Sequence, residues 1–406
     1  MTVPPRAVDI AVIGGGIVGT SIAWHLARRG AGRVALFERS TIAVGASGRT
    51  GALLRRHYSN RAEATLAQAG FQTYRDWQEV VGGPPVHTPW PLIVTVDTGP
   101  GREANVERLH RNVAMQNEVG IAARVVSAQE LSTLQPQARF DDIAAAALEP
   151  DSGYVDAVAA TRGMAHAAIR AGATIHEGCA VLGLLTAGDR VVGVRTAGGD
   201  VAASATVVSS GAWSVPLLAA IGVAVPMTAL RVQVAVLHRP LAMEEPHYVY
   251  LDTAAGMFCR PWGPGRTLIG VGGGDQHDPV DPDRYAEGND PDYPARAIAA
   301  IARRLPGMTG AAYLHGHAGI YDLTPDAHPI LGTAGPDGLF LALGFSGAGF
   351  KKGPAVGQAL AELILDGRAS LVDLAPFALA RFATDAWRAP WGPDEYESAT
   401  DFGHGL

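Results

Sequence analysis

A glycine turn between an apolar run and an amphipathic stretch constrains the fold most strongly. The run VDIAVIG is typical of a central strand, IVGTSIAWHLARRG predicts a helix ending at Gly30, and RVALFER predicts a second strand. In Gly14-x-Gly16-x-x-Gly19, the first glycine permits the turn, the second lets backbone approach a pyrophosphate, and the third packs helix on strand. This β-α-β unit predicts an α/β fold with a doubly wound sheet.

A carboxylate at the end of the second predicted strand adds a ligand preference. Glu38 follows Gly19 by 19 residues, where it can accept both hydroxyls of an adenosine ribose. An acidic side chain there argues against a 2′-phosphate, and therefore against NADP. The helix N-terminus supplies free N–H groups for phosphates. The unit predicts an adenine dinucleotide, but it leaves NAD and FAD both open.

The composition is that of an ordinary globular protein. The 406 residues are 48% hydrophobic and 17% charged, with a net charge of −7, which argues against disorder and nucleic-acid binding. Cys179 and Cys259 cannot form a disulfide framework, so we expect a cytoplasmic protein without a metal site. Seven residues precede the first apolar run, too few for a signal peptide. Glycine, serine or proline interrupts the uncharged stretches 10–27 and 201–230, so we expect no membrane span.

The lysines are confined to one place. All but two of the 32 basic residues are arginine, and the two lysines, Lys351 and Lys352, adjoin each other in GFSGAGFKKGPAVG. A general preference for arginine does not explain why they lie together in a glycine-rich segment. We expect a helix to begin at Gly353-Pro354, since proline suits a first helical turn.

Five segments together resemble the D-amino-acid oxidase/sarcosine oxidase family of FAD-dependent amine oxidoreductases. They are GGGIVG with Glu38, GASGRTG, GAWS at 211–214, YDLTPDAHPILG at 321–332 and GFSGAGFK at 344–351. Regions 86–150 and 226–310 match only in general character. The resemblance implies FAD, held by Gly14, Gly16, Ile17, Val18, Gly19, Glu38, Arg39, Gly45, Ser47, Arg49, Thr50, Gly51, Val181, Gly211, Trp213, Gly344, Ser346, Gly347, Gly349, Phe350 and Lys351.

The resemblance also implies two lobes assembled from separated segments. The expected FAD-binding lobe is Rossmann-like and comprises residues 1–85, 150–225 and 321–375. The expected substrate lobe is α+β, is built on a large mixed or antiparallel sheet, and comprises 86–149 and 226–320. A C-terminal tail covers 376–406, and its role cannot be read from the sequence.

Similar proteins hold a substrate carboxylate between an arginine and a lysine, which here correspond to Arg55 and Lys351. Arg56 and Lys352 are the neighbouring alternatives, and Arg260 is a further candidate from the second lobe. Four side chains could line an aromatic pocket for the amine: Tyr250, Tyr58, Tyr321 and His57. The implied reaction is hydride transfer to flavin N5 from the C–H beside an amine nitrogen, giving an imine that water hydrolyses.

Two departures from the family affect the chemistry. Gly319 stands where covalent-flavin relatives carry cysteine, so we expect noncovalent FAD. No lysine precedes Lys351, so the oxygen-activating lysine of the oxidases is missing, and oxygen or another acceptor is expected. Four alternatives remain: a flavoprotein subunit of a larger electron-transfer complex, a tailoring amine oxidase acting on a natural-product intermediate, a flavin monooxygenase or halogenase, and an NAD dehydrogenase.

Overall fold

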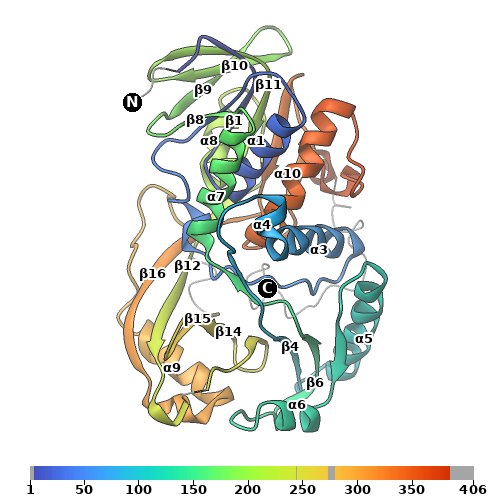
Figure 1. Ribbon diagram of the computed structural model, residues 1–406, viewed down its shortest axis with the longest axis vertical. Helices are drawn as coiled ribbons and strands as arrows, with labels where there is room; N and C mark the ends of the chain where they lie inside the picture. The colour runs from blue at the N-terminus through green and yellow to red at the C-terminus, as the bar shows by residue number, and fades with distance from the viewer. Residues whose placement is uncertain (1–3, 244, 273–278, 385–406) are drawn as a thin grey trace.

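The computed structural model describes residues 4–243, 245–272 and 279–384, which form two lobes, each built on an eight-stranded sheet (Figure 1). Residues 385–406, most of the expected C-terminal tail, lie outside the described residues. The α/β architecture expected from the sequence is confirmed.

The glycine turn joins the central strand of the first sheet to a buried helix. This strand, β1 (Ala7–Ile13), pairs in parallel with β2 (Val34–Phe37) and β11 (Gly199–Val208). Helix α1 (Ile17–Arg28) follows it directly. The strand order of the sheet is β17 (Ile330–Thr333), β18 (Leu339–Leu343), β11, β1, β2 and β8 (Thr174–His176), with β10 (Val191–Thr196) antiparallel on β11 and β9 (Val181–Thr186) antiparallel on β10.

Helices pack around α1 on this lobe. Helix α7 (Ala157–Arg170) and α10 (Gly349–Asp366) both contact α1, and α3 (Arg61–Arg75) contacts α10 (Figure 1). Asp156 caps α7, since its carboxylate accepts a hydrogen bond from Ala159 N at 2.9 Å. The apolar core that these helices share contains residues from the first, middle and last thirds of the chain.

Helix α10 begins earlier than the sequence suggested. We expected it to start at Gly353-Pro354, but it starts at Gly349, and Pro354 lies inside it. A proline there cannot donate to the carbonyl four residues earlier, on Phe350. That carbonyl instead accepts the Tyr74 hydroxyl of α3 at 2.8 Å, so a neighbouring helix satisfies the freed group.

The second sheet is mixed, as expected. Only β13 (Val249–Asp252) with β4 (Leu92–Asp97) is parallel, and the other pairs are antiparallel. The strand order is β16 (Ala312–Leu323), β12 (Thr228–His238), β15 (Arg266–Val271), β14 (Met257–Pro261), β13, β4, β6 (Ile143–Glu149) and β5 (Arg124–Val126). The remaining α-helices and strands are α2 (Ala46–Arg49), α4 (Trp77–Val80), α5 (Arg102–Glu118), α6 (Ala128–Leu134), α8 (Ser214–Ala219), α9 (Tyr293–Arg304), β3 (His87–Thr88) and β7 (Tyr154–Val155).

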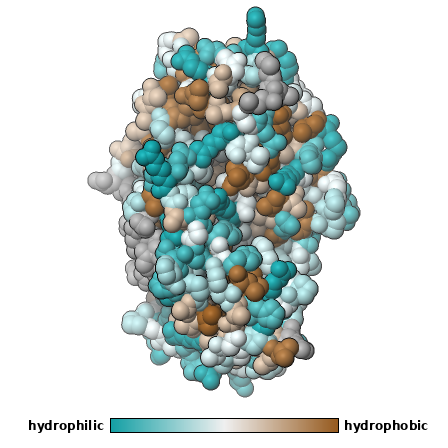
Figure 2. Space-filling view, turned by 90° about the vertical axis from the view of Figure 1, so that its left-hand side faces the viewer, coloured by the Kyte–Doolittle hydropathy of each residue, from teal (hydrophilic) through white to brown (hydrophobic). Residues whose placement is uncertain are grey.

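Helices cover both faces of this sheet. Tyr250 and Ile93 pack with α9 and α6 on one face, whereas Leu251 and Leu92 pack with α5 on the other. Because side chains alternate along a strand, neighbouring residues enter different cores. On the face shown in Figure 2, apolar residues form small areas separated by polar ones.

Candidate active site

The glycine turn leaves backbone exposed at the start of α1. Gly14 has a φ of 110°, and a Cβ built there would lie 2.6 Å from Ser209 O. A Cβ on Gly19 would lie 2.1 Å from Gly14 O, so this glycine lets α1 pack on β1. On Gly16, a Cβ would lie 3.0 Å from the hydroxyl of Ser47. Side chains are therefore excluded from the turn, which brings the N-terminus of α1 to the pocket lining, where its positive end favours a phosphate.

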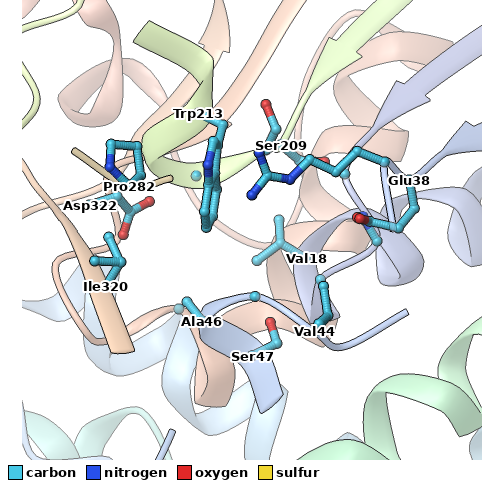
Figure 3. A pocket seen from close by; sticks show the side chains of 18 of the residues that line it. Val18, Glu38, Val44, Ala46, Ser47, Ser209, Trp213, Pro282, Ile320 and Asp322 are labelled. Atoms are coloured by element: carbon cyan, nitrogen blue, oxygen red, sulfur yellow. The ribbon is translucent and has the colours of Figure 1, made fainter. Parts of the chain in front are cut away.

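A long pocket runs from this turn to the junction of the lobes. Its volume is about 720 Å³. Glu38, Ser209 and Trp213 lie around its space from the first lobe, and Pro282 and Ile320 from the second (Figure 3). Glu38 lies on one side of this space and Ile320 and Asp322 lie on the other (Figure 3). An extended molecule with a nucleotide at one end fits this shape.

Most of the predicted cofactor residues line the pocket. They are Gly14, Gly16, Ile17, Val18, Glu38, Arg39, Gly45, Ser47, Arg49, Thr50, Val181, Gly211, Trp213, Gly347, Gly349 and Phe350. The predicted residues outside the lining are Gly19, Gly51, Gly344, Ser346 and Lys351. Gly344 N donates to the Asp322 carboxylate at 2.8 Å, and this carboxylate lines the pocket in its place.

Glu38 holds the turn at the nucleotide end. Its carboxylate accepts hydrogen bonds from Gly15 N at 2.7 Å and from Ser40 N at 2.8 Å. An ionised carboxylate keeps further lone pairs for ribose hydroxyls.

Replacing Glu38 with alanine is therefore expected to weaken FAD binding about 10- to 100-fold, the equivalent of one lost hydrogen bond to a charged group. The dissociation constant for FAD, measured by fluorescence quenching on apoprotein, tests this. Glu177→Gln, which alters a neighbouring carboxylate that bonds Ile42 N, is the control. A constant within twofold of wild type for Glu38→Ala would contradict the assigned role.

Sequence reasoning missed a segment of the second lobe that closes over the pocket. The Asp283 carboxylate accepts from Arg39 at 2.6 Å and from the Trp213 indole at 2.8 Å. Arg49 donates to the Tyr285 hydroxyl at 2.8 Å. Residues 282–287 carry no recognisable motif, and only the folded chain brings them to the pocket. Ser209 was missed too, although it precedes the predicted Gly211 at a strand end.

Positive charge gathers next to the pocket residues Phe350 and Tyr321. Lys351 follows the pocket residue Phe350 and is 7% exposed. Arg55 is buried, its guanidinium carbon lies 4.5 Å from the centre of the Tyr58 ring, and its charge acts on Tyr321. Burial lowers the pKa of Lys351 to about 8, and the charges of Arg55 and Lys352 act in the same direction. A cluster this buried and this positive favours an anionic ligand.

In each pair of adjacent cations, one member forms an ion pair with protein carboxylates. Arg56 bonds Asp151 and lies 3.6 Å from Glu149, both in the same chain segment. Lys352 is fully buried and forms an ion pair with Glu63. Among the described residues, Lys351 has no carboxylate at ion-pair distance. Arg56 and Lys352 are therefore neutralised by the protein itself, which leaves Lys351 available to a ligand.

The two second-lobe candidates lie apart from one another. Arg260 donates to Gly51 O at 2.6 Å and stacks 4.4 Å from the Tyr154 ring, beside the segment that lines the pocket. Tyr250 instead lies in the second-lobe core, where its hydroxyl is 3.4 Å from Gln135 Oε1. The structure does not bring Tyr250 to the pocket, because its strand position faces α9.

The fold and the site together define a two-lobed dinucleotide-binding oxidoreductase. The pocket fits FAD, since glycine backbone, Glu38 and the lobe junction follow one another along its length. Residues 9–363 match the family model described as DAO, FAD dependent oxidoreductase. The chain belongs to this family, and its cofactor is FAD.

Three relatives illustrate the similarity. The chain is 28% identical to mitochondrial sarcosine dehydrogenase of Mus musculus, over 93% of this chain and 42% of the relative. Glycine oxidase of Geobacillus kaustophilus is 27% identical over 92% of this chain and 97% of its own. The crystal structure of L-proline dehydrogenase from P. horikoshii has a TM-score of 0.84 at 24% identity, covering 94% and 99% of the two chains. The chain spans less than half the length of the first curated relatives it matches.

The described ranges lack two further features. None of their helices is both long and apolar enough to cross a bilayer. Nor do His, Cys, Asp and Glu side chains there gather in threes suited to a metal ion.

Proposed function

We propose that this chain oxidises the C–N bond of a small amine or amino acid, with a secondary, N-alkyl or D-amino acid as substrate. The observation that carries the proposal is Lys351, a buried cation that follows the pocket residue Phe350, with Arg55 close by. A buried cation without a carboxylate partner among the described residues suits a substrate carboxylate. The relatives named for sarcosine and glycine support the same class.

The chain contributes binding and orientation. Lys351 and Arg55 hold the carboxylate, which fixes the neighbouring C–H bond relative to the pocket, and the buried surroundings exclude water. When bound, FAD supplies the acceptor for the hydride that leaves this C–H bond. Arg260, at Gly51, is proposed to support the pocket wall from the second lobe.

We also propose that FAD is held without a covalent bond. Gly319 lines the pocket, and a Cβ there would lie 3.3 Å from the Arg49 Cβ. Cys259 is fully buried in the second-lobe core and Cys179 is buried in the first lobe. Both cysteines are free, which supports a reducing, cytoplasmic setting. We assign residues 1–85, 150–225 and 321–375 to the FAD lobe and 86–149 and 226–320 to the substrate lobe.

The reaction is tested by its product. Incubation with a panel of N-methyl and D-amino acids, in air and separately with an artificial electron acceptor, should yield an aldehyde, a keto acid or an amine from one of them. Product formed in air identifies oxygen as an acceptor, and product formed only with the added acceptor identifies a dehydrogenase. If no compound is consumed with either acceptor by the FAD-loaded protein, the proposal fails.

One relative favours a second possibility, a flavoprotein subunit of a larger complex. Sarcosine oxidase subunit beta of Rhodobacter capsulatus is 25% identical over 93% of this chain and 89% of its own. In that case the isolated chain would take up FAD but would turn over amines only when its partners are added.

A further inference from the structure

Tyr58 is surrounded by positive charge next to the proposed carboxylate site. The side chain is 8% exposed. The Lys352 ammonium lies 4.0 Å and the Arg55 guanidinium carbon 4.5 Å from the centre of its ring. Lys351 lies close enough to interact with its hydroxyl. That hydroxyl is buried, and it makes no hydrogen bond of ordinary geometry within the described residues. A buried hydroxyl of this kind is available to a ligand.

One of these cations, Lys352, forms an ion pair with a buried carboxylate. Glu63, on α3, binds the Lys352 ammonium with one oxygen and His328 Nδ1 with the other, at 2.9 Å for the histidine. Burial alone would raise the pKa of Glu63, but Lys352 and His328 hold it well below its usual range. Glu63 is therefore ionised, and it offsets the charge of Lys352.

The charges favour ionisation of Tyr58. Burial alone would raise the pKa of this phenol, but Lys351, Lys352 and Arg55 outweigh it and lower the pKa to about 8, while Glu63 acts in the opposite direction. An ionised Tyr58 in turn favours the charged form of Lys351, so the two groups titrate as a pair.

The other groups around Tyr58 are poorer proton acceptors. Burial, assisted by the charge of Arg55, lowers the pKa of His57 to about 3. The amide of Gln116 lies 3.1 Å from its Nδ1 and also donates to Tyr58 O. Burial raises the pKa of Tyr321. Lys351 would lose its charge, and with it the carboxylate, if it served as the base. Tyr58 is the group that combines position with ready ionisation.

We propose that Tyr58 accepts the proton that the substrate's ammonium group must lose before its C–H bond is oxidised, and that Glu63 acts through Lys352 as a positioning residue that sets how readily Tyr58 ionises. The inference rests on the proposed amine oxidation. In this step an N–H bond breaks, its electron pair stays on nitrogen, and an O–H bond forms on the phenolate of Tyr58. The free amine that results has the lone pair needed to assist departure of hydride from the adjacent carbon.

Substrate-free holoprotein gives the first test. Tyrosinate absorbance is followed during a pH titration of wild type and of Tyr58→Phe, with Tyr313→Phe, an exposed tyrosine of β16, as the control. One ionisation with a midpoint near 8 should be present in wild type and in Tyr313→Phe and missing from Tyr58→Phe. If Tyr58→Phe keeps that ionisation, the proposal is wrong.

Variants that remove the charge of Glu63 or Lys352 distinguish an effect on the ionisation of Tyr58 from a purely structural role. Glu63→Gln should lower the Tyr58 midpoint, Lys352→Met should raise it, and the double variant, which removes both charges, should return it toward wild type. A pair that only stabilises the fold would lower the melting temperature of both single variants without moving the midpoint in opposite directions. Equal midpoints in all folded variants would overturn the role of Glu63.

Flavin reduction by an amine without air gives the last test. In wild type the limiting rate should rise with pH to a plateau above about 8, because the base must be deprotonated. In Tyr58→Phe it should fall about 100-fold or more, as on loss of a general base, and lose that pH dependence. A Tyr58→Phe enzyme that keeps the wild-type rate and profile refutes the proton transfer while amine oxidation stands. If no amine reduces the wild-type flavin, the proposed function itself fails and the proton-transfer role fails with it.

Discussion

Lys351→Met is expected to lower the efficiency of flavin reduction, the limiting rate divided by the substrate dissociation constant, by about 30- to 3,000-fold. Removing one partner of a buried charge pair costs about 2–5 kcal/mol, and each 1.4 kcal/mol is a factor of ten. Lys351 is buried, and within the described ranges it has no protein carboxylate at ion-pair distance, so a ligand carboxylate would be its partner.

Lys351→Met should impair the binding and oxidation of the substrate but not the binding of FAD or the stability of the fold. FAD content and melting temperature should change little, because methionine fills a similar volume. Arg195→Met, which alters an exposed arginine of β10, is the matched control for a lost positive charge. If Lys351→Met reduces flavin within threefold of wild type, the carboxylate site must lie elsewhere, and Arg260 becomes the candidate to vary next.

Gly70→Ala is expected to destabilise the FAD lobe by at least about 3 kcal/mol, at the upper end for an overpacked core. A Cβ on this residue of α3 would lie 2.0 Å from Lys351 O, a backbone atom of α10. The helices would have to separate, which weakens the hydrogen bond from Tyr74 to Phe350 O. Helix propensity alone predicts the opposite sign, since alanine is favoured over glycine by about 1 kcal/mol.

Thermal unfolding of the FAD-loaded protein measures this effect. The midpoint should fall by at least about 5 °C, given the usual change per kcal/mol in domains of this size. Gly183→Ala, in strand β9, is the control, because a Cβ there meets nothing within 4 Å. A Gly70→Ala midpoint equal to or above wild type would show that the two helices are not packed as closely as the structure has them.

Local sequence patterns predicted the β-α-β unit that carries part of the pocket lining. The turn at Gly14 and the carboxylate of Glu38 both depend on residues close together in the chain, and both belong to the pocket lining. The physical reason is that strand, turn and helix N-terminus form one continuous segment whose geometry the glycines impose.

Long-range packing accounts for what the sequence could not predict. Alternation along a strand shows that Tyr250 and Leu251 face opposite ways, but not which face looks toward the FAD lobe. Pro354 was interpreted as a first-turn residue, because only the folded chain brings Tyr74 to the carbonyl it frees. In the same way, Asp283 carries no signal of its contacts with Arg39 and Trp213.

The most direct test of the account is the visible spectrum of the purified protein before and after an amine is added without air. The account predicts a yellow protein whose oxidised-flavin bands are bleached by an N-methyl, secondary or D-amino acid, and bleached far more slowly in Lys351→Met. A yellow protein that none of these compounds bleaches would contradict the proposed amine oxidation by the isolated chain. A colourless protein that does not take up FAD would contradict the assignment of the pocket itself.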